Sequence, residues 1–356
     1  MRWEAEQEKG TQPPTVSLGQ VPDLRKRELC RAGQPIGRLS APHSFFSQNS
    51  GVTQAGPCRI EMAQPAPNYL MKATKAIVTA ASPTHRTLPL QTLVDRDGEV
   101  RTVLEILLGE IVSAGIEDIC LIIHPGDEEG YRAAASHFAG AVSFVEQTER
   151  RGYGHALSLA AEFVGGEPFF HTVCDHLFIS KDPERSCARQ LMECAEREGC
   201  AMSAVQPTRE TEISLYGAVA GTLKKSGGPQ PVYQVKDVLE KPTPTEAEQR
   251  LIVPGLRAGQ YLTFFGMHVL TPIVMELLRK EVRDAAGQAH ANIQLSPVLA
   301  ELAKREQYGA ALIRGSRHHI SLKYGLYYTQ LALALSGKDK SMVLSEMLEL
   351  MARDHQ

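Results

Sequence analysis

The sequence has few of the features that mark secreted, zinc-binding or membrane-spanning chains. It has seven cysteines in 356 residues, and none of them forms a C-x-x-C pair. An odd number without such pairs argues against a disulfide framework or a structural zinc site and fits a reducing cytoplasm. No apolar run approaches the roughly 18 residues that cross a membrane, and the start, MRWEAEQEKG, lacks the apolar segment of a secretory signal. We therefore expect a cytoplasmic protein without membrane contact.

The chain also lacks an excess of charge of either sign. It carries 38 Lys and Arg against 41 Asp and Glu, which gives a formal net charge of -3. Nucleic-acid binding needs a basic face, and no basic stripe with interleaved aromatic residues is present. We expect small-molecule substrates and no nucleic-acid partner. An anionic substrate would require cations placed locally in its site.

A glycine-rich loop is missing where the first apolar strand ends. The run KAIVTAA (Lys75–Ala81) continues into Ser82, Pro83 and Thr84. Glycine lets backbone N–H groups approach phosphates, whereas Pro83 has no N–H to offer. An NAD-type Rossmann protein is disfavoured, because this turn lacks G-x-G-x-x-G. The segment is either an ordinary connection between strand and helix or an altered phosphate loop.

The first 70 residues differ in composition from the rest. They are rich in Pro, Gly, Ser and Gln and show neither helical nor strand periodicity. Such a segment buries too little apolar surface to offset its chain entropy. We expect residues 1–70 to be a disordered tail, or an extension upstream of the true start, since Met71 immediately precedes the first strand.

From residue 72 onward, apolar strands alternate with amphipathic helices, which predicts an α/β fold. We expect a Rossmann-like, mostly parallel mixed sheet flanked by helices over residues 72–330. Shorter strands in 216–266 suggest an antiparallel insertion that closes over a site. Residues 331–356 should form C-terminal helices that pack on this domain or at a subunit contact, which allows a homo-oligomer. The expected strands are 75–81, 118–124, 142–146, 169–174 and 201–206, and the expected helices are 103–114, 131–138, 154–163, 273–281, 293–305, 324–335 and 341–351.

One motif suits the recognition of a nucleobase. Gln147 follows an expected strand, and GYGHA opens the next helix. The carboxamide of Gln147 offers one donor and one acceptor, as the edge of a pyrimidine requires. Gly152 and Gly154 permit close approach of the backbone. The neighbouring Arg150 and Arg151 are interpreted as solvated loop charges.

An acidic residue, Asp175, ends the apolar strand Phe169–Cys174. Ligands of open parallel sheets bind at the carboxyl ends of the strands. Asp175 is either a helix N-cap or turn residue, or a ligand of Mg²⁺ in a phosphate-binding site.

The order of these motifs, with VLEKPTP (Val238–Pro244) downstream, resembles the sugar-phosphate nucleotidyltransferases. Within that family the resemblance is to the UTP–glucose-1-phosphate uridylyltransferases, and it covers about residues 72–330. It implies attack of a sugar-1-phosphate on the α-phosphorus of UTP, with release of pyrophosphate. It assigns Mg²⁺ to Asp175 and pyrophosphate to Arg86. It further implies nucleotide contacts from Ala80, Ala81, Gln91, Gln147 and Gly152, and sugar-phosphate contacts from Tyr216, Gly217, Glu240, Lys241 and Gly266, with Arg86, Asp175 and Lys241 as the catalytic residues.

The chain departs from the family pattern on the triphosphate and metal side. No lysine occurs between Lys75 and Arg101, so the lysine of the phosphate loop is absent. In GSRHHIS, His319 falls at or near the position of the family's second metal-binding aspartate. Imidazole is a poorer ligand for Mg²⁺ than carboxylate is. The chain is therefore either a nucleotidyltransferase or a catalytically impaired relative that binds nucleotide sugars or has a regulatory role.

Overall fold

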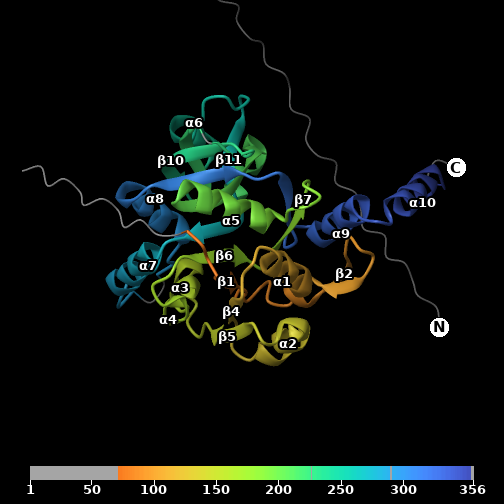
Figure 1. The fold of residues 1–356 in the computed structure, drawn as a ribbon, viewed down its shortest axis with the longest axis horizontal. Coiled ribbons are helices and arrows are strands. Elements are labelled where there is room, and N and C mark those ends of the chain that lie inside the picture. The colour runs from red at the N-terminus through yellow and green to blue at the C-terminus, as the bar shows by residue number, and fades with distance from the viewer. Residues whose placement is uncertain (1–70, 226, 289–290, 354–356) are drawn as a thin grey trace, which may run out of the picture. The chain divides into compact units, whose positions relative to one another are not determined.

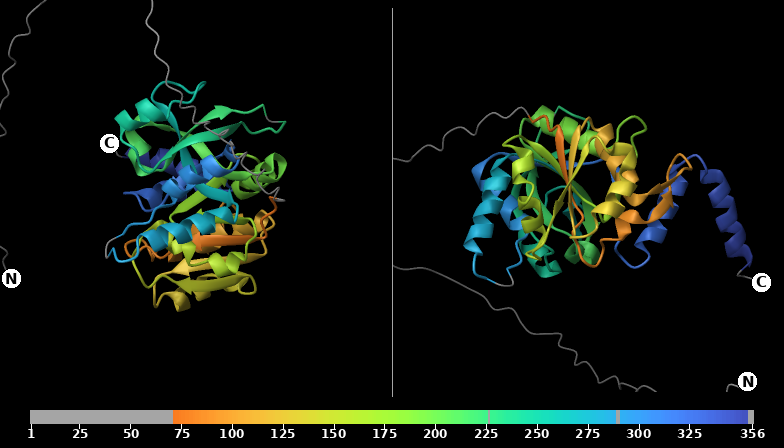
Figure 2. Two further views of the ribbon diagram at one scale, coloured as in Figure 1. Left: turned by 90° about the vertical axis from the view of Figure 1, so that its left-hand side faces the viewer. Right: turned by 90° about the horizontal axis from the view of Figure 1, so that it is seen from below.

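The computed structural model describes residues 71–225, 227–288 and 291–353, and the tail expected over residues 1–70 lies outside them. A nine-stranded mixed sheet organises these residues, with helices on both faces (Figures 1 and 2). The strand order is β5-β4-β1-β6-β11-β8-β12-β10-β9. The α/β class expected from the alternation of strands and helices is confirmed.

One half of the sheet is parallel. Its strands are β5 (Val142–Glu146), β4 (Asp118–Ile123), β1 (Lys75–Thr79) and β6 (Phe169–Val173). Successive side chains of a strand point to opposite faces. Ala76 and Val78 accordingly join one core cluster, whereas Ile77 joins the other. β1 and β4 are mostly apolar because helices cover both of their faces, whereas β5, at the edge of the sheet, has no buried residue.

The two faces carry different helices. The cluster on one face contains residues of α1 (Val103–Ser113) and α5 (Cys187–Glu198). The cluster on the other face contains residues of α3, α4, α7 and α8. The bounds of the remaining helices are α2 Glu128–Ala134, α3 Tyr153–Ser158, α4 Ala161–Val164, α6 Pro244–Arg250, α7 Ile273–Asp284 and α8 Leu295–Arg305, with 3-10 turns η1 Leu88–Leu90, η2 Ser136–Phe138 and η3 Glu210–Leu215.

The second half of the sheet is mixed and partly closes on itself. Its strands are β11 (Gln260–Leu270), β8 (Ala201–Arg209), β12 (Tyr308–Leu312), β10 (Val232–Leu239) and β9 (Ala218–Leu223). Because β9 pairs with both β10 and β11, these strands form a closed ring of pairings. The antiparallel insertion expected over 216–266 thus supplies β9, β10 and the start of β11.

Two expected helices differ in their bounds. The helix expected over 131–138 begins earlier, because Glu128 and Glu129 occupy the first turn of α2, where the helix dipole favours negative charge. The helix expected over 154–163 is divided into α3 and α4. Neither difference moves the ends of the strands that carry the site.

A small two-stranded ribbon was not expected from the sequence. Strands β7 (His176–Ser180) and β13 (Gly315–His319) pair antiparallel, with His176 opposite His319. Directly opposed residues of an antiparallel pair present their side chains on the same face. This register brings His319 beside the end of β6. A second ribbon, β2 (Thr92–Val94) with β3 (Val100–Thr102), precedes α1.

The two C-terminal helices differ in burial. Helix α9 (Gly325–Ser336) begins before the expected boundary at residue 330 and buries Thr329 and Leu333. Helix α10 (Lys340–Arg353) has no buried residue and exposes Met342, Leu344, Leu348, Leu350 and Met351. Oligomerisation through this end stays a prediction. Among the described helices, none combines the length and apolarity that a membrane crossing needs.

A half-buried carboxyl group joins α1 to α5 and leads to a stability prediction. Glu110 accepts a hydrogen bond from the Ala188 N–H at 2.7 Å, and burial raises the pKa of Glu110 to about 7. A carboxyl pKa that is higher in the folded state stabilises at low pH, and this contribution is lost as the pH rises through 7. Relative to Glu110→Gln, the wild type should lose roughly 2–3 kcal/mol of unfolding free energy between pH 5 and 8.

Urea unfolding of both proteins across this pH range measures the difference. The matched control is Glu117→Gln, since Glu117 is exposed at the end of the loop before β4. Stability curves for wild type and Glu110→Gln that run parallel with pH would contradict the prediction.

Candidate functional site

Two cavities meet at the carboxyl ends of the parallel strands. The larger has a volume of about 410 Å³ and the smaller about 230 Å³. Tyr153, Val173 and Asp175 line both of them. A group bound in one cavity therefore lies next to a group bound in the other, with Asp175 in the shared wall.

The larger cavity carries the expected base-reading residues. The Nε2 atom of Gln147 donates to the Gly152 carbonyl at 3.2 Å and lies 3.1 Å from Nδ1 of His155. Because the amide nitrogen is used in this way, the carboxamide oxygen of Gln147 is the atom left to face a ligand.

Gly152 needs to be glycine at this position. Its φ is 97°, in the left-handed region, and an added Cβ would lie 2.5 Å from the carbonyl oxygen of Ile293. The segment that contains Ile293 also packs against the start of α3, where Gly154 N–H donates to the same carbonyl at 2.8 Å. The backbone at the cavity mouth is thus fixed from both sides.

The altered phosphate loop lines the larger cavity only in part. Ala81, Ser82, Pro83 and His85 are among its lining residues. Arg86 is not: its guanidinium lies 3.4 Å from Asp127 and 3.0 Å from His124. The pyrophosphate contact expected of Arg86 stays a prediction, and in this conformation the guanidinium is occupied elsewhere.

Two further residues expected at the nucleotide lie outside the cavity lining. Gln91 is exposed, and its side chain donates to the Thr87 carbonyl at 3.3 Å. Ala80 is buried, and its N–H donates to the Ile122 carbonyl at 2.7 Å. The structure therefore brings together Ala81, Gln147, Gly152 and Asp175, and leaves Ala80, Arg86 and Gln91 apart from them.

The smaller cavity contains all five residues expected to bind the sugar phosphate. Its lining includes Tyr216, Gly217, Glu240, Lys241 and Gly266. Glu240 accepts a hydrogen bond from the Ser296 hydroxyl. A Cβ at Gly217 would lie 2.7 Å from the Phe264 ring, so only glycine fits there.

Lys241 has an unusual backbone for a lysine. Its φ is 45°, in the left-handed region, which costs a non-glycine residue about 1–2 kcal/mol. Among the described residues, no carboxylate or hydrogen-bond partner contacts its side chain. Lys241 is exposed, so its charge is solvated at the edge of this cavity and available to an anionic ligand.

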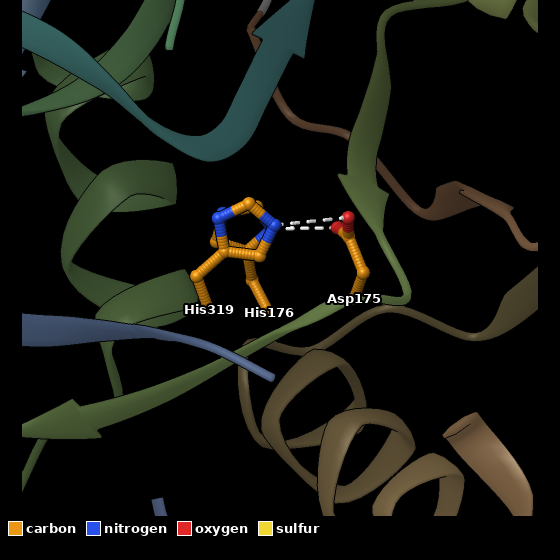
Figure 3. A group of neighbouring side chains, drawn as sticks. All are labelled: Asp175, His176 and His319. Atoms are coloured by element: carbon orange, nitrogen blue, oxygen red, sulfur yellow. Dashed lines mark hydrogen bonds and ion pairs between the residues drawn. The ribbon is translucent and has the colours of Figure 1, made fainter. Parts of the chain in front are cut away.

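Asp175 forms a carboxylate–imidazole cluster with His176 and His319 (Figure 3), and all three residues line the smaller cavity. Oδ1 of Asp175 lies 2.7 Å from Nδ1 of His176, and Oδ2 lies 3.4 Å from Nε2 of His319. The two imidazoles are stacked, with centroids 4.3 Å apart and planes inclined by 22°. The His319 side chain is only 15% exposed, so it does not face solvent.

Electrostatics set the ionisation of this cluster. Burial by itself raises the pKa of Asp175, but His176 and His319 outweigh it, so that the pKa lies well below its usual value. Burial lowers the pKa of His176, against the opposing effect of Asp175. The result is an ionised carboxylate that accepts a hydrogen bond from Nδ1–H of a neutral imidazole, and both groups can donate electron pairs to an ion once that proton moves to Nε2.

These donors fit Mg²⁺ poorly. Mg²⁺ is held by oxygen ligands in octahedral geometry, whereas imidazole suits softer divalent ions. Within the described part of the chain, Asp175 is the carboxylate of the cluster and two imidazoles complete it. No step below is derived through Mg²⁺.

Arg317, which was not among the expected site residues, supports the cluster. The Arg317 guanidinium lies 3.4 Å from the centre of the Tyr216 ring and donates to the Phe264 carbonyl. The Tyr216 ring lies 5.7 Å from the His319 ring and 6.3 Å from the His176 ring. A buried cation thus fixes an aromatic ring that in turn packs against both imidazoles.

Comparisons with known proteins show which family the chain belongs to. Residues 85–314 match the family described as nucleotidyl transferase. The chain is 26% identical over 315 residues to the UTP–glucose-1-phosphate uridylyltransferase YngB of Bacillus subtilis, covering 80% of this chain and 97% of that one. It is 28% identical over 306 residues to UTP–glucose-1-phosphate uridylyltransferase 2 of Staphylococcus saprophyticus, covering 77% and 95%.

Solved structures show the same fold. A UDP-glucose pyrophosphorylase complexed with UDP-glucose aligns with a TM-score of 0.59 at 23% identity, covering 73% of this chain and 98% of that one. A UTP-bound UGPase from Acinetobacter baumannii aligns with a TM-score of 0.58 at 20% identity, covering 78% and 98%. The chain belongs to the nucleotidyl transferase family, as its motifs indicate.

Proposed function

We propose that this chain transfers the nucleotidyl group of UTP to a hexose-1-phosphate, giving a UDP-sugar and pyrophosphate. The observation that carries the proposal is the pair of adjacent cavities that share Asp175. One is lined by residues suited to a pyrimidine and the other by residues suited to a sugar phosphate. The names of the curated relatives support glucose as the hexose.

The nucleotide occupies the larger cavity in this proposal. The Gln147 carboxamide oxygen accepts from the N3–H of uracil, and the Gly152 N–H donates to a ring carbonyl. The cavity volume, about 410 Å³, is in the range of small-ligand sites. The α-phosphorus then lies toward Asp175.

The sugar phosphate occupies the smaller cavity. Glu240 accepts from sugar hydroxyls, and Lys241 offsets the phosphate dianion. A phosphate oxygen of the sugar attacks the α-phosphorus in line, a new P–O bond forms, and the bond to the departing pyrophosphate breaks. The protein contributes positioning and charge neutralisation, because no covalent intermediate is required. A divalent cation bound at Asp175 would neutralise charge on the reacting phosphates.

One specific feature supports a second candidate, a binding protein with little turnover. Pro83 has no N–H for the triphosphate, and Arg86 is engaged by Asp127 at 3.4 Å. A protein with these changes could bind the UDP-sugar product yet fail to hold the departing pyrophosphate.

A pyrophosphate-release screen separates the two. The purified full chain is combined with each of the four common NTPs and a panel of sugar-1-phosphates, in parallel with Mg²⁺, Mn²⁺ or Co²⁺. We expect the highest rate with UTP and glucose-1-phosphate. Absence of release for every pair, together with measurable UDP-glucose binding by calorimetry, would establish the binding protein instead. Absence of both release and binding would exclude both candidates.

A further inference from the structure

We propose that Asp175, His176 and His319 form a two-histidine, one-carboxylate site that binds a transition-metal ion such as Mn²⁺ or Co²⁺ in preference to Mg²⁺. The ligand atoms of the three residues all lie within 4.8 Å of one another. Ion binding can be measured without turnover. The proposal therefore rests on the proposed function only for the role of the ion in the reaction. The existence of the binding site does not depend on that function.

The two separations between Asp175 and its imidazoles are compatible with a coordination sphere. With metal–ligand bonds of about 2.0–2.1 Å, neighbouring donors lie about 3.0 Å apart in octahedral and about 3.4 Å apart in tetrahedral geometry. The two pairs in the cluster are separated by 2.7 Å and 3.4 Å. Ligation would require the rings to rotate and the His176 proton to move from Nδ1 to Nε2, in place of the present hydrogen bond.

Figure 3 shows that both imidazoles direct a nitrogen toward the Asp175 carboxylate. They project from two different strands, β7 and β13, at directly paired positions. This pairing, with the stacking of the rings and the support from Tyr216 and Arg317, holds the donors in place before any ion binds.

The two ring nitrogens of His319 differ in their hydrogen bonding. Its Nδ1 is buried without a hydrogen-bond partner in the described part of the chain, which is unfavourable unless the ring gains something in return. Its Nε2 lies 2.7 Å from the Ser321 hydroxyl, which can donate to a neutral ring nitrogen or move aside for an ion. An ion bound at Nε2 would take the place of the Ser321 contact, and Nδ1, on the other side of the ring, would keep its present surroundings.

The site is open on the side where substrate would lie. All three residues line the smaller cavity, and Asp175 also lines the larger one. Catalytic metal sites have three protein ligands and keep further positions for substrate. Nitrogen donors favour later first-row ions over Mg²⁺. The ion would therefore face both phosphates of the proposed reaction.

The test uses the full chain after treatment with a chelator. Co²⁺ binding is followed by its visible absorption and Mn²⁺ binding by electron paramagnetic resonance, each with Mg²⁺ as competitor. We expect Co²⁺ to bind at least about 100-fold more tightly than Mg²⁺. His176→Gln and His319→Gln should each weaken Co²⁺ binding by about 10–100-fold or more and change its spectrum. His318→Gln is the matched control, because His318 adjoins His319 in the sequence and hydrogen-bonds Ser316 instead.

A substitution that should increase Mg²⁺ binding controls for variants that lose ion binding because they unfold. His319→Asp replaces nitrogen by oxygen and should strengthen Mg²⁺ binding while weakening Co²⁺ binding. Equal affinities of the wild type for Mg²⁺ and Co²⁺ would overturn the proposal, as would a Co²⁺ spectrum that neither His176→Gln nor His319→Gln alters. Selective Co²⁺ binding without pyrophosphate release would refute the proposed function and leave the metal site standing.

Discussion

Asp175→Asn should reduce pyrophosphate release by about 10²–10³-fold in kcat or more, equivalent to roughly 3–4 kcal/mol of transition-state stabilisation. Asparagine keeps the size of the side chain and can still accept from His176 at the observed 2.7 Å position. The substitution removes only the negative charge in the wall between the two cavities. A cation that this carboxylate would hold could then no longer neutralise charge on the reacting phosphates.

The control for this experiment is Asp118→Asn, which removes an exposed carboxylate at the start of β4, at the opposite edge of the sheet. Binding of UDP-glucose measured by calorimetry should persist in Asp175→Asn, because the base-reading and sugar-binding residues are unchanged. Turnover by Asp175→Asn within a few-fold of the wild type would show that this carboxylate has no part in the transfer.

The parallel half of the sheet could be predicted because its signal is local. Short apolar runs such as 75–81 and 118–124, which alternate with helical segments, favour strands covered on both faces. Since the carboxyl ends of parallel strands share one edge, the residues that follow them, Gln147 and Asp175, could be placed near one another in advance. The described structure places both on the larger cavity.

The imidazole partners of Asp175 could not be predicted in the same way. The ribbon of β7 and β13 joins segments that are far apart in the chain, and GSRHH has no apolar alternation to mark it as a strand. The motif comparison identified His319 as a substitution, but only the register shows it opposite His176. The one signal in the sequence was that His176 directly follows Asp175. This signal is weak, because neighbours along a strand ordinarily point to opposite faces.

Arg86 illustrates the limit of assigning a role by position alone. Its place in the sequence fits a pyrophosphate contact, whereas its guanidinium lies between Asp127 and His124. Ion pairs depend on which side chains the fold brings within a few ångströms, and no pattern near Arg86 indicates Asp127. The residues of the smaller cavity are the opposite case, because the five that the family resemblance assigned to the sugar phosphate all line this one cavity.

Lys241→Met should raise the KM for the sugar-1-phosphate by about 10–100-fold and change the KM for UTP little, since a charge-assisted hydrogen bond contributes about 1.5–3 kcal/mol. Methionine keeps the length of the side chain and removes its charge. Lys241 lines the smaller cavity and not the larger one, so only binding of the sugar-1-phosphate should weaken. Initial-rate kinetics with each substrate varied in turn measure the two constants.

Lys236→Met is the control, because Lys236 is exposed on the same strand, β10, that leads to Glu240 and Lys241. It should leave both KM values near those of the wild type. The left-handed backbone of Lys241 remains in the variant, so a change in stability would affect both substrates alike, whereas loss of a phosphate contact would not. Equal increases in both KM values would therefore mean that Lys241 shapes the site without binding the sugar phosphate.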